Sequence, residues 1–556
     1  MKITGAQAII RCLVEQNVDT VFGYPGGAIL PLYDALYDAP IRHILPVHEQ
    51  GAAHMADGYA RATGKVGVCI ATSGPGATNL VTGLATAFMD SVPVVAITGQ
   101  VSTSLIGRDA FQEVDITGIT MPVTKHNFLV KDSKKLPEII RQAFRIAKFG
   151  RPGPVLIDIP RDVQTAEVEY CQQILPTEPE WSPMPAVRKM IEEATEVISK
   201  AKRPVIHIGG GVIAAEVHQE VQYLAEKCSI PVVSSLMGLG GIANKHPCFL
   251  GLTGMHGHKI ANATVHNADL IIAIGSRFSD RVTGDRVRYA ADKKFIHIDV
   301  DPAEIDKNVA VHIGLTGHLK QIITMINSTI EKGDTAEWWA VIRQWQTDYA
   351  TEQKGKQPLL AEWAMQHICE KTDGLPVSFV TDVGQHQMWA AQNLVIKAPR
   401  SWITSGGLGT MGFGLPAAIG AQLACPDKRV IHFAGDGGFK MTGAELFTVA
   451  THELPIISII IDNSCLGMVK QLQKVYFPNR YSHSVIPEMD FVTFAKAFGI
   501  EGAVVNTKKA FTKAFNKAYS DNKPYLIVIK IDQDDVVTPM VAPGATLDEY
   551  VSLNGS

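Results

Sequence analysis

The sequence predicts an α/β protein with three doubly wound parallel-sheet domains. Its 556 residues exceed what one core supports, and about 150 residues per domain gives three to four domains. Short apolar strands alternate with helical stretches in three successive blocks, a pattern typical of parallel sheets covered by helices on both faces. Proline-rich or polar segments separate the blocks, so three domains fit best.

The first block runs to about Tyr170, and residues 1–172 are assigned to the first domain. Its clearest strands are expected at Val66–Ala71, Val92–Thr98 and Val155–Ile159. The stretch Leu175–Ala186 contains four prolines, which interrupt regular elements. We interpret it as a linker.

The second and third blocks are divided by another connecting segment. The second domain is expected at residues 187–330 and opens with the strand Pro204–Ile208. The polar, tryptophan-containing segment Glu331–Leu360 is interpreted as a connector. The third domain is expected at residues 360–534. The tail, residues 535–556, contains Pro539–Gly544 and is expected to form few regular elements.

Composition excludes several functional classes. The chain is 46% hydrophobic and 19% charged, as in ordinary globular α/β proteins. A net charge of -4 without a concentrated Lys/Arg run argues against nucleic acid or an anionic membrane as the main partner. The 8 cysteines show no CxxC spacing, so neither a zinc site nor a disulfide framework is predicted. With no signal-like apolar segment, we expect a cytoplasmic protein.

One segment predicts a metal-diphosphate site. The apolar strand Val430–Ala434 opens into Gly435-Asp436-Gly437, and the next strand, Leu454–Ile461, ends before Asn463. In a right-handed β-α-β unit both strands end at the same edge, so Asp436 and Asn463 should lie close together. Their oxygens suit Mg²⁺, and glycine lets backbone N–H groups approach a phosphate. The alternative is a tight strand-to-helix turn without a ligand.

Two further segments carry weaker signals. The expected strand Ile41–Val47 leads into His48-Glu49-Gln50-Gly51 and an alanine-rich helix, Ala52–Ala62, which places Glu49 at a strand end. Without other evidence, Glu49 is interpreted as a carboxylate in the first turn of a helix, where the helix dipole stabilises it. Gly209-Gly210-Gly211 follows the strand Pro204–Ile208 and suits a dinucleotide phosphate, although a glycine-rich turn without a ligand explains it equally well.

With the Gly-Asp-Gly and Asn spacing in place, the chain resembles the thiamin-diphosphate enzymes. Over essentially its whole length it is similar to the acetohydroxyacid synthase (acetolactate synthase) catalytic large subunits. The resemblance rests on these segments: Tyr24–Ala28, His48–Gly51, Ser73–Asn79, Gly107–Glu113, Gly150–Pro154, Gly275–Arg281, Ile296–Asp301, Gly384–Trp389 and Ser405–Pro416.

The resemblance implies an activity, cofactors and partners. The family decarboxylates pyruvate and joins the two-carbon unit to a second pyruvate or to 2-ketobutyrate, in branched-chain amino acid biosynthesis. The implied cofactors are thiamin diphosphate, Mg²⁺ and FAD. The implied assembly is a homodimer or homotetramer, with a regulatory small subunit as a possible partner. The alternatives are an FAD-dependent pyruvate oxidase, another thiamin-dependent 2-ketoacid decarboxylase, and a non-catalytic thiamin-binding scaffold.

The resemblance also implies residue roles. Glu49 would stand beside the aminopyrimidine, Met411 under the thiazolium ring, and Arg281 at the second substrate's carboxylate. The residues implied in catalysis are Glu49, Gln112, Gly27, Phe111, Arg281, Met411 and Leu472. The implied metal ligands are Asp436, Asn463 and the carbonyl of Cys465.

Most of the implied cofactor contacts fall into two groups. Those for thiamin diphosphate are Tyr24, Pro25, Glu49, Gln385, His386, Gly409, Met411, Gly435, Asp436, Gly437, Gly438, Asn463, Cys465, Leu466, Gly467 and Met468. Those for the flavin are Arg151, Gly209, Gly210, Gly211, Ser235, Leu236, Met255, His256, Gly275, Ser276, Arg277, Arg281, Asp299 and Val300. Gln387 and Met388 are implied cofactor contacts without assignment to either group.

Three positions depart from the family pattern. Arg161 stands where the family has a Lys, which preserves the charge but changes the side-chain shape. Leu472 stands where the family usually has the Trp that shapes the acceptor pocket, which leaves acceptor preference open. His318 stands where the family has an Asp near the flavin adenine, which leaves flavin affinity open.

Overall fold

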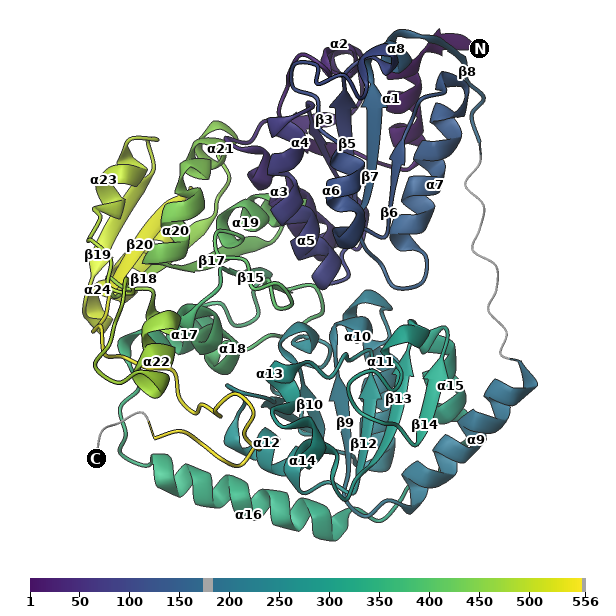
Figure 1. Cartoon of the computed structure of the whole chain (residues 1–556). Helices are drawn as coiled ribbons and strands as arrows, with labels where there is room; N and C mark the ends of the chain where they lie inside the picture. The colour runs from purple at the N-terminus through teal and green to yellow at the C-terminus, as the bar shows by residue number, and fades with distance from the viewer. Residues whose placement is uncertain (174–183, 553–556) are drawn as a thin grey trace.

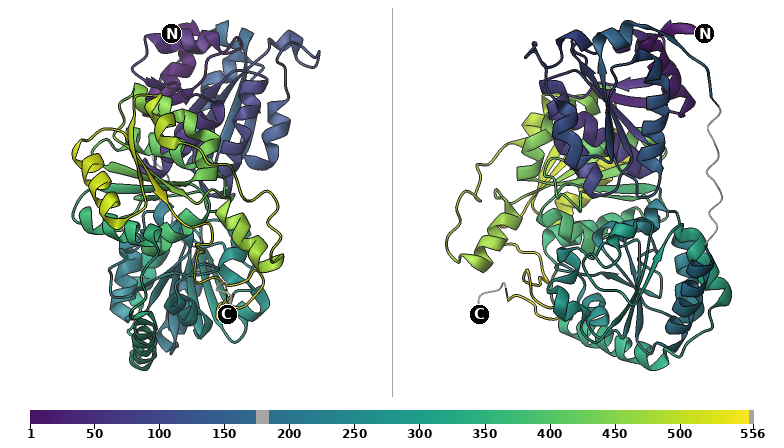
Figure 2. Two further views of the ribbon diagram at one scale, coloured as in Figure 1. Left: turned by 90° about the vertical axis from the view of Figure 1, so that its left-hand side faces the viewer. Right: turned by 45° about the vertical axis from the view of Figure 1, so that its right-hand side comes forward.

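The computed structural model describes residues 1–173 and 184–552, and it confirms the predicted three parallel-sheet α/β units. Each unit holds one six-stranded sheet with helices on both faces (Figure 1). The views in Figure 2 place the first and middle units at opposite ends of the molecule, with the third packed beside both. Most of the predicted linker Leu175–Ala186 lies outside the described residues.

The first sheet has the strand order β3-β2-β4-β5-β7-β6, and all neighbours are parallel. Its strands are β2 (Thr20–Gly23), β3 (Arg42–Ile44), β4 (Gly67–Ala71), β5 (Val94–Gln100), β6 (His126–Leu129) and β7 (Val155–Pro160). Its helices are α1 (Gly5–Glu15), α2 (Leu30–Tyr37), α3 (Glu49–Thr63), α4 (Pro75–Asn79), α5 (Val81–Met89), α6 (Ile116–Thr120), α7 (Leu136–Lys148) and α8 (Arg161–Thr165). An antiparallel pair, β1 (Lys2–Thr4) with β8 (Glu167–Glu169), joins the two ends of this unit.

Strand β5 is buried on both sides, which accounts for the continuous run of apolar residues in its sequence. Val95 and Ile97 pack toward α1 and α7, whereas Val94 and Ala96 pack toward α3 and α5. Both faces are therefore buried. Strand β3 is shorter than the predicted Ile41–Val47, because Pro46 has no N–H to continue the ladder.

The middle sheet has the order β11-β10-β9-β12-β13-β14, also parallel throughout. Its strands are β9 (Pro204–Ile208), β10 (Val232–Ser234), β11 (Phe249–Leu252), β12 (Leu270–Ile274), β13 (Lys294–Asp299) and β14 (Ile313–Thr316). Its helices are α9 (Pro185–Lys200), α10 (Gly210–Ala214), α11 (His218–Cys228), α12 (Lys259–His266), α13 (Asp280–Thr283), α14 (Arg286–Ala290), α15 (Leu319–Thr329) and α16 (Ala336–Gln353).

Helix α16 corrects the prediction of a connector at Glu331–Leu360. It is an 18-residue helix along the outer side of the middle unit (Figure 1). Trp338 and Ile342 are buried against Phe295 and neighbouring apolar side chains of this unit. The buried face of α16 is narrow, and most of its other residues are polar. The sequence therefore suggested a connector.

The third sheet has the order β16-β15-β17-β18-β20-β19, again all parallel. Its strands are β15 (Val377–Thr381), β16 (Trp402–Ile403), β17 (Arg429–Gly435), β18 (Ile457–Asp462), β19 (Glu501–Val505) and β20 (Tyr525–Lys530). Its helices are α17 (Leu360–Lys371), α18 (Gln385–Asn393), α19 (Gly414–Ala424), α20 (Asp436–Thr442), α21 (Leu446–Thr451), α22 (Gly467–Tyr476), α23 (Phe491–Lys496) and α24 (Lys508–Ser520).

Helices α3 and α19 form the main contact between the first and third units. Gly58 lies against the backbone of Ala417, and Gly420 lies against the backbone of Met55. A Cβ at either glycine would collide with a carbonyl, so these positions permit the two helices to pack closely. Beyond β20, the tail returns to the middle unit, where Val541 N donates to Met255 O at 2.8 Å.

Candidate functional site

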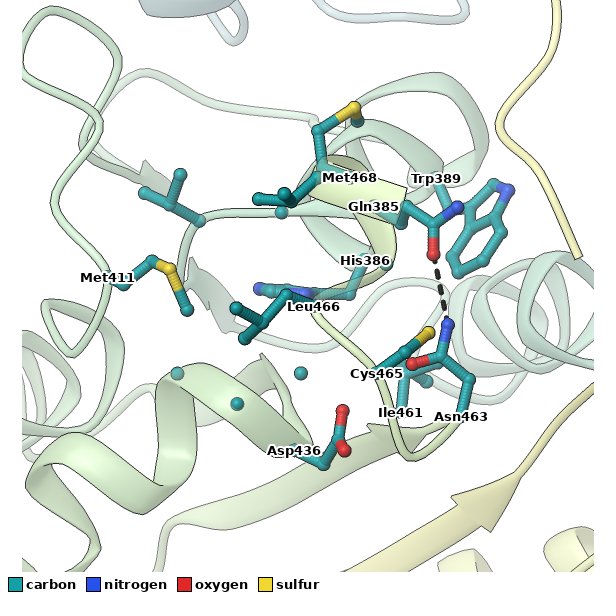
Figure 3. Close-up of a pocket in the computed structure, with 17 residues that line it drawn as sticks. Gln385, His386, Trp389, Met411, Asp436, Ile461, Asn463, Cys465, Leu466 and Met468 are labelled. Atoms are coloured by element: carbon teal, nitrogen blue, oxygen red, sulfur yellow. Dashed lines mark hydrogen bonds between the residues drawn. The ribbon is translucent and has the colours of Figure 1, made fainter. Parts of the chain in front are cut away.

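A pocket with an empty volume of about 430 Å³, partly open to solvent, lies at the carboxyl ends of β15, β17 and β18 (Figure 3). This edge is where parallel α/β sheets usually bind ligands. The pocket gathers predicted residues from segments far apart in the sequence: Gln385, His386, Met411, Gly435, Asp436, Gly437, Gly438, Asn463, Cys465, Leu466, Gly467 and Met468. Val383, Gly384, Trp389, Ile461 and Val469 complete the lining.

Asp436 is the strongest indication of a cation site. It begins α20 directly after β17, and it is 2% exposed. Its Oδ2 atom has no hydrogen-bond partner among the described residues. Burial, together with the nearby charge of Asp462, raises the pKa of the Asp436 carboxyl to about 7. A cation beside this carboxylate would supply the missing partner.

Asn463 follows β18 and faces the same space (Figure 3). Its Nδ2 donates to Gln385 Oε1 at 3.1 Å, which leaves its Oδ1 available as a ligand. Gln385 is fixed in turn, because its Nε2 donates to Gln471 Oε1 at 2.9 Å and to Asp535 O at 3.0 Å. One carboxylate, one amide oxygen and the nearby Cys465 carbonyl form an all-oxygen set of the kind that Mg²⁺ accepts. The described residues contain no cluster of three or more His, Cys, Asp or Glu side chains suited to a metal.

The remaining lining suits a phosphate group. Helices α18 and α22 both begin at the pocket, so their first N–H groups point toward it. His386 is fully buried, and burial lowers its pKa to about 4, so the ring is neutral at pH 7. Met411 and Leu466 supply an apolar wall above Gly437.

The first-domain residues form a separate group at the edge of their own sheet. Glu49 begins α3, and its Oε2 accepts from Asn79 Nδ2 at 2.9 Å. Gln112 adopts a positive φ of 59° and lies against Gly74. Phe111 is 88% exposed, and no described atom lies within 4 Å of where a Cβ on Gly27 would stand. Tyr24 and Pro25 are exposed beside Gly27.

Within one chain these residues do not line the pocket that contains Asp436. Helix α3 has 15 residues and spans about 22 Å. Glu49 lies at its first turn, whereas Arg61, near its last turn, reaches Thr404 O at 2.8 Å beside the pocket. Among the described residues of a single chain, the predicted first-domain residues and the Asp436 pocket therefore do not share one cavity.

The predicted flavin contacts cluster along the carboxyl edge of the middle sheet, because nearly all follow β9, β10, β11, β12 or β13. Asp299 is buried, and burial raises its pKa to about 6. Gly209 and Gly211 pack against the backbone of Gly275, so close chain packing already accounts for glycine there. Arg151, from the first domain, bonds Glu304 at 2.6 Å and Asp301 at 3.4 Å.

Arg281 lies in a second pocket. It is lined by Ser279, Asp280, Arg281, Gly284, Arg286, Asn308, Pro543 and Gly544. The Arg281 side chain is 61% exposed, and its nearest acidic partner is Asp280 at 3.4 Å. The C-terminal tail closes one side of this pocket through Pro543 and Gly544.

Four other predicted residues are not part of the Asp436 pocket lining: Gln387, Met388, Gly409 and Leu472. Gln387 points elsewhere on α18, because its Nε2 donates to Thr404 Oγ1 at 2.7 Å. Met388 packs against the apolar core. Leu472 is half-buried on α22, beyond the first turn that reaches the pocket.

Sequence reasoning missed several buried charges around the site. Asp382 accepts from Gly412 N at 2.9 and 3.0 Å, and Glu445 accepts from Val47 N at 3.1 Å directly before α3. Arg61 and Asp90 join the first domain to the loop that carries Met411. Of these contacts, the sequence could have indicated only the ion pair between Asp57 and Arg61, because the two residues are four apart on one helix.

Comparisons with known proteins agree with this architecture. Three family models match the chain: the N-terminal thiamine pyrophosphate binding domain at residues 3–119, the thiamine pyrophosphate enzyme central domain at 191–326, and the C-terminal thiamine pyrophosphate binding domain at 382–529. Within the described residues, no helix is long and apolar enough to cross a membrane.

Curated relatives cover nearly the whole chain. The acetolactate synthase isozyme 2 large subunit of Escherichia coli K12 is 45% identical over 99% of both chains. The acetolactate synthase large subunit of Corynebacterium glutamicum is 46% identical over 98% of this chain and 89% of its own. The probable acetolactate synthase large subunit of Methanocaldococcus jannaschii is 46% identical over 98% of this chain and 95% of its own. The chain therefore belongs to the thiamine pyrophosphate enzymes and, among them, to the acetolactate synthase large subunits.

Proposed function

We propose that the protein is an acetolactate synthase that decarboxylates pyruvate and joins the two-carbon unit to a second pyruvate, or to 2-ketobutyrate. The single observation that carries this proposal is the Asp436 pocket, whose buried carboxylate oxygen has no hydrogen-bond partner among the described residues and would be satisfied by a cation, at the edge of a thiamine pyrophosphate binding domain. Near-full-length similarity to acetolactate synthase large subunits supports the substrate.

We propose that the pocket holds Mg²⁺ and the diphosphate of thiamin diphosphate. Asp436, the Asn463 amide and the Cys465 carbonyl would hold the metal, and the first turns of α18 and α22 would bind the phosphates. When bound, thiamin diphosphate supplies a nucleophilic carbon and accepts the electron pair released by decarboxylation. Leu466 and Met411 line the adjoining face and would present an apolar surface to the bound cofactor.

Glu49 is proposed to exchange a proton with the aminopyrimidine nitrogen of the cofactor. Because Glu49 does not line the Asp436 pocket of its own chain, we propose a homodimer in which each site combines Glu49 of one chain with Asp436 of the other. Gln112 and Phe111 would enter the same site with Glu49. A homotetramer and a regulatory small subunit are compatible with this arrangement.

FAD is proposed to bind along the carboxyl edge of the middle sheet. Its role there would be structural, since the proposed carboligation moves no net electrons. Arg281 is proposed to bind the acceptor carboxylate, because guanidinium pairs bidentately with carboxylates. The eight cysteines are all unpaired in the described chain, which supports a proposed cytoplasmic location.

The decisive experiment supplies purified protein with pyruvate, thiamin diphosphate and Mg²⁺, and it measures acetolactate, CO₂ and oxygen. We expect one acetolactate and one CO₂ for every two pyruvates, with no oxygen uptake. A matched reaction with Glu49→Gln should form almost none. Oxygen consumption in step with pyruvate use would identify an oxidase instead. Cofactor binding without any pyruvate turnover would identify a non-catalytic scaffold.

A further inference from the structure

The loop at residues 404–413 carries Met411 into the pocket, and its sequence gives it little intrinsic rigidity. It connects β16 to α19 and contains Gly406, Gly407, Gly409 and Gly412. Gly409 and Gly412 adopt φ values of 69° and 87° in the left-handed region, which favours glycine. A glycine-rich segment loses much conformational entropy when ordered, so contacts from outside the loop must hold its course.

Asp90 of the first domain provides the first such contact. Its side chain is fully buried at the end of α5. Gly407 N donates to Asp90 Oδ1 at 2.7 Å, and Gly406 N donates to Asp90 Oδ2 at 3.1 Å. One carboxylate therefore binds two successive amides of a loop that belongs to another domain.

Arg61 and Thr86 extend this contact along the loop. Arg61, whose side chain is 9% exposed, pairs with Asp57 and with Asp90 at 2.9 Å, and it donates to Thr404 O at 2.8 Å. Its guanidinium also lies over the Phe413 ring, 5.2 Å from the centroid. Thr86 Oγ1 shares a hydrogen bond of 2.7 Å with Thr410 Oγ1.

The third domain holds the residue that follows Met411. Gly412 N donates to both oxygens of Asp382 at 2.9 and 3.0 Å, and Thr442 Oγ1 donates to Gly412 O at 2.9 Å. Met411 thus sits between Thr410, which the first domain holds, and Gly412, which the third domain holds. Neither anchor alone fixes it.

We propose that Arg61, Thr86 and Asp90 form an interdomain clamp that positions Met411 in the pocket of the same chain. The clamp residues are positioning residues, since they act through the loop. The inference deepens the proposed function and rests on it for the role of Met411. It gives α3 two tasks: its first turn carries Glu49, and its last turn, through Arg61, holds the loop of its own chain's pocket.

The first test needs no cofactor. In Asp90→Asn the amide cannot replace the carboxylate toward Arg61 and both glycines, so backbone amides at residues 404–412 should exchange hydrogen for deuterium faster than in wild type. The matched control is Glu15→Gln, because Glu15 is also a buried first-domain carboxylate, bonded to Arg141 at 2.9 Å and to Gln173 N at 3.1 Å. Unchanged loop protection in Asp90→Asn would overturn the proposal.

The second test measures exchange of the C2 proton of thiamin diphosphate in saturated protein. Misplacing a reacting group by about 1 Å can cost 100-fold, so Asp90→Asn should exchange about 10- to 100-fold more slowly, with thiamin diphosphate affinity changed much less. Glu15→Gln should exchange at the wild-type rate. Equal rates in wild type and Asp90→Asn, or equal slowing in both variants, would contradict a specific clamp.

Two less disruptive variants test the clamp if Asp90→Asn does not fold. Thr86→Val and Thr410→Val each remove the hydrogen bond between the two hydroxyls with little change in volume, and Thr86→Val also removes the contact of Thr86 Oγ1 with Thr82 O at 2.9 Å. Both should slow C2–H exchange, and the double variant should be no slower than the slower single one. Additive effects would show that the two hydroxyls do not act through each other. If wild-type protein makes no acetolactate, the proposed function fails while these comparisons still decide the clamp.

Discussion

The two halves of the proposed thiamin site differ in how far one chain builds them. The third-domain half is a lined pocket in which Gln385 fixes Asn463, and Asp382 fixes the loop beside Met411. The first-domain half is more exposed, with Phe111 in solvent and a single side-chain hydrogen bond to Glu49, from Asn79, among the described residues. Under the proposed function, one chain would prepare the metal and diphosphate end alone, whereas the proton-transfer end would need a surface from another chain.

The largest expected effect is the loss of proton transfer in Glu49→Gln, which alters the first-domain half and leaves the third-domain half unchanged. Glu49→Gln keeps the size and the hydrogen bond to Asn79 but cannot exchange a proton, and loss of a positioned acid–base group costs about 100- to 10,000-fold. C2–H exchange in bound thiamin diphosphate should fall by this factor, while Mg²⁺ and cofactor affinities stay near wild type. Wild-type exchange in Glu49→Gln would remove Glu49 from the site.

Leu472, the proposed acceptor-contacting residue on α22 outside the Asp436 pocket lining, gives the next effect. One methylene in a fitted apolar pocket is worth about 1–3 kcal/mol, or about 10- to 200-fold in discrimination. With Leu472 in place of a flat aromatic wall, wild type should prefer 2-ketobutyrate only weakly in competition with pyruvate, and Leu472→Trp should raise the preference within that range. A strong preference in wild type that Leu472→Trp leaves unchanged would place the acceptor wall elsewhere on α22.

Asp436→Asn tests the third-domain half directly. Even loss of a residue that supports a metal ligand commonly costs about 10- to 100-fold in metal affinity, so loss of the carboxylate itself should weaken Mg²⁺-dependent thiamin diphosphate binding by at least that factor. Titration calorimetry with and without Mg²⁺ would measure it, with Glu49→Gln as the matched carboxylate-to-amide control. Equal thiamin diphosphate affinities in Asp436→Asn and Glu49→Gln would contradict the proposal that only the third-domain half binds the metal and the diphosphate.

The smallest effect concerns the core beneath the first-domain half. Asp158 is buried between Thr98 and Gln100, and burial raises its pKa to about 7. The native state then binds the proton more tightly than the unfolded state, so this contribution to stability is full below about pH 4 and is lost as pH rises toward 7, by at most about 1.4 kcal/mol per unit of pKa shift.

Asp158→Asn should remove that part of the pH dependence. Unfolding of cofactor-free protein in urea at pH 5 and pH 8 should show a larger loss of stability for wild type than for the variant. Mg²⁺ affinity should not change, because Asp158 lies in the first domain. Parallel pH profiles would mean that Asp158 is ionised in the native protein.

The sequence predicted the parts of the site that follow strand ends. Asp436 and Asn463 meet because parallel strands terminate at one edge, and the same rule grouped the middle-domain residues. Adjacent residues on a helix face different directions, so Gln385 and His386 line the pocket while Gln387 bonds Thr404, and the predicted cofactor contact of Gln387 stays a prediction. Arg61 and Asp90 escaped notice because their partners lie more than 300 residues away in sequence.

Helix α16 shows a second limit of prediction from the sequence. Its two buried side chains, Trp338 and Ile342, lie among charged residues, and only the middle unit's surface reveals which face they occupy. The fold class, by contrast, was predictable because each sheet buries both faces and so leaves long apolar runs.

The most direct test of the account mixes two inactive chains. Glu49→Gln and Asp436→Asn chains, co-expressed with different tags, form hybrid dimers in which one of two sites has both residues intact. If each site combines Glu49 of one chain with Asp436 of the other, random pairing should restore about a quarter of wild-type acetolactate formation, and tag-selected hybrids about half. Each variant alone should stay inactive. No recovery in folded, cofactor-saturated hybrids would show that both residues act within one chain and would contradict the division of the site described here.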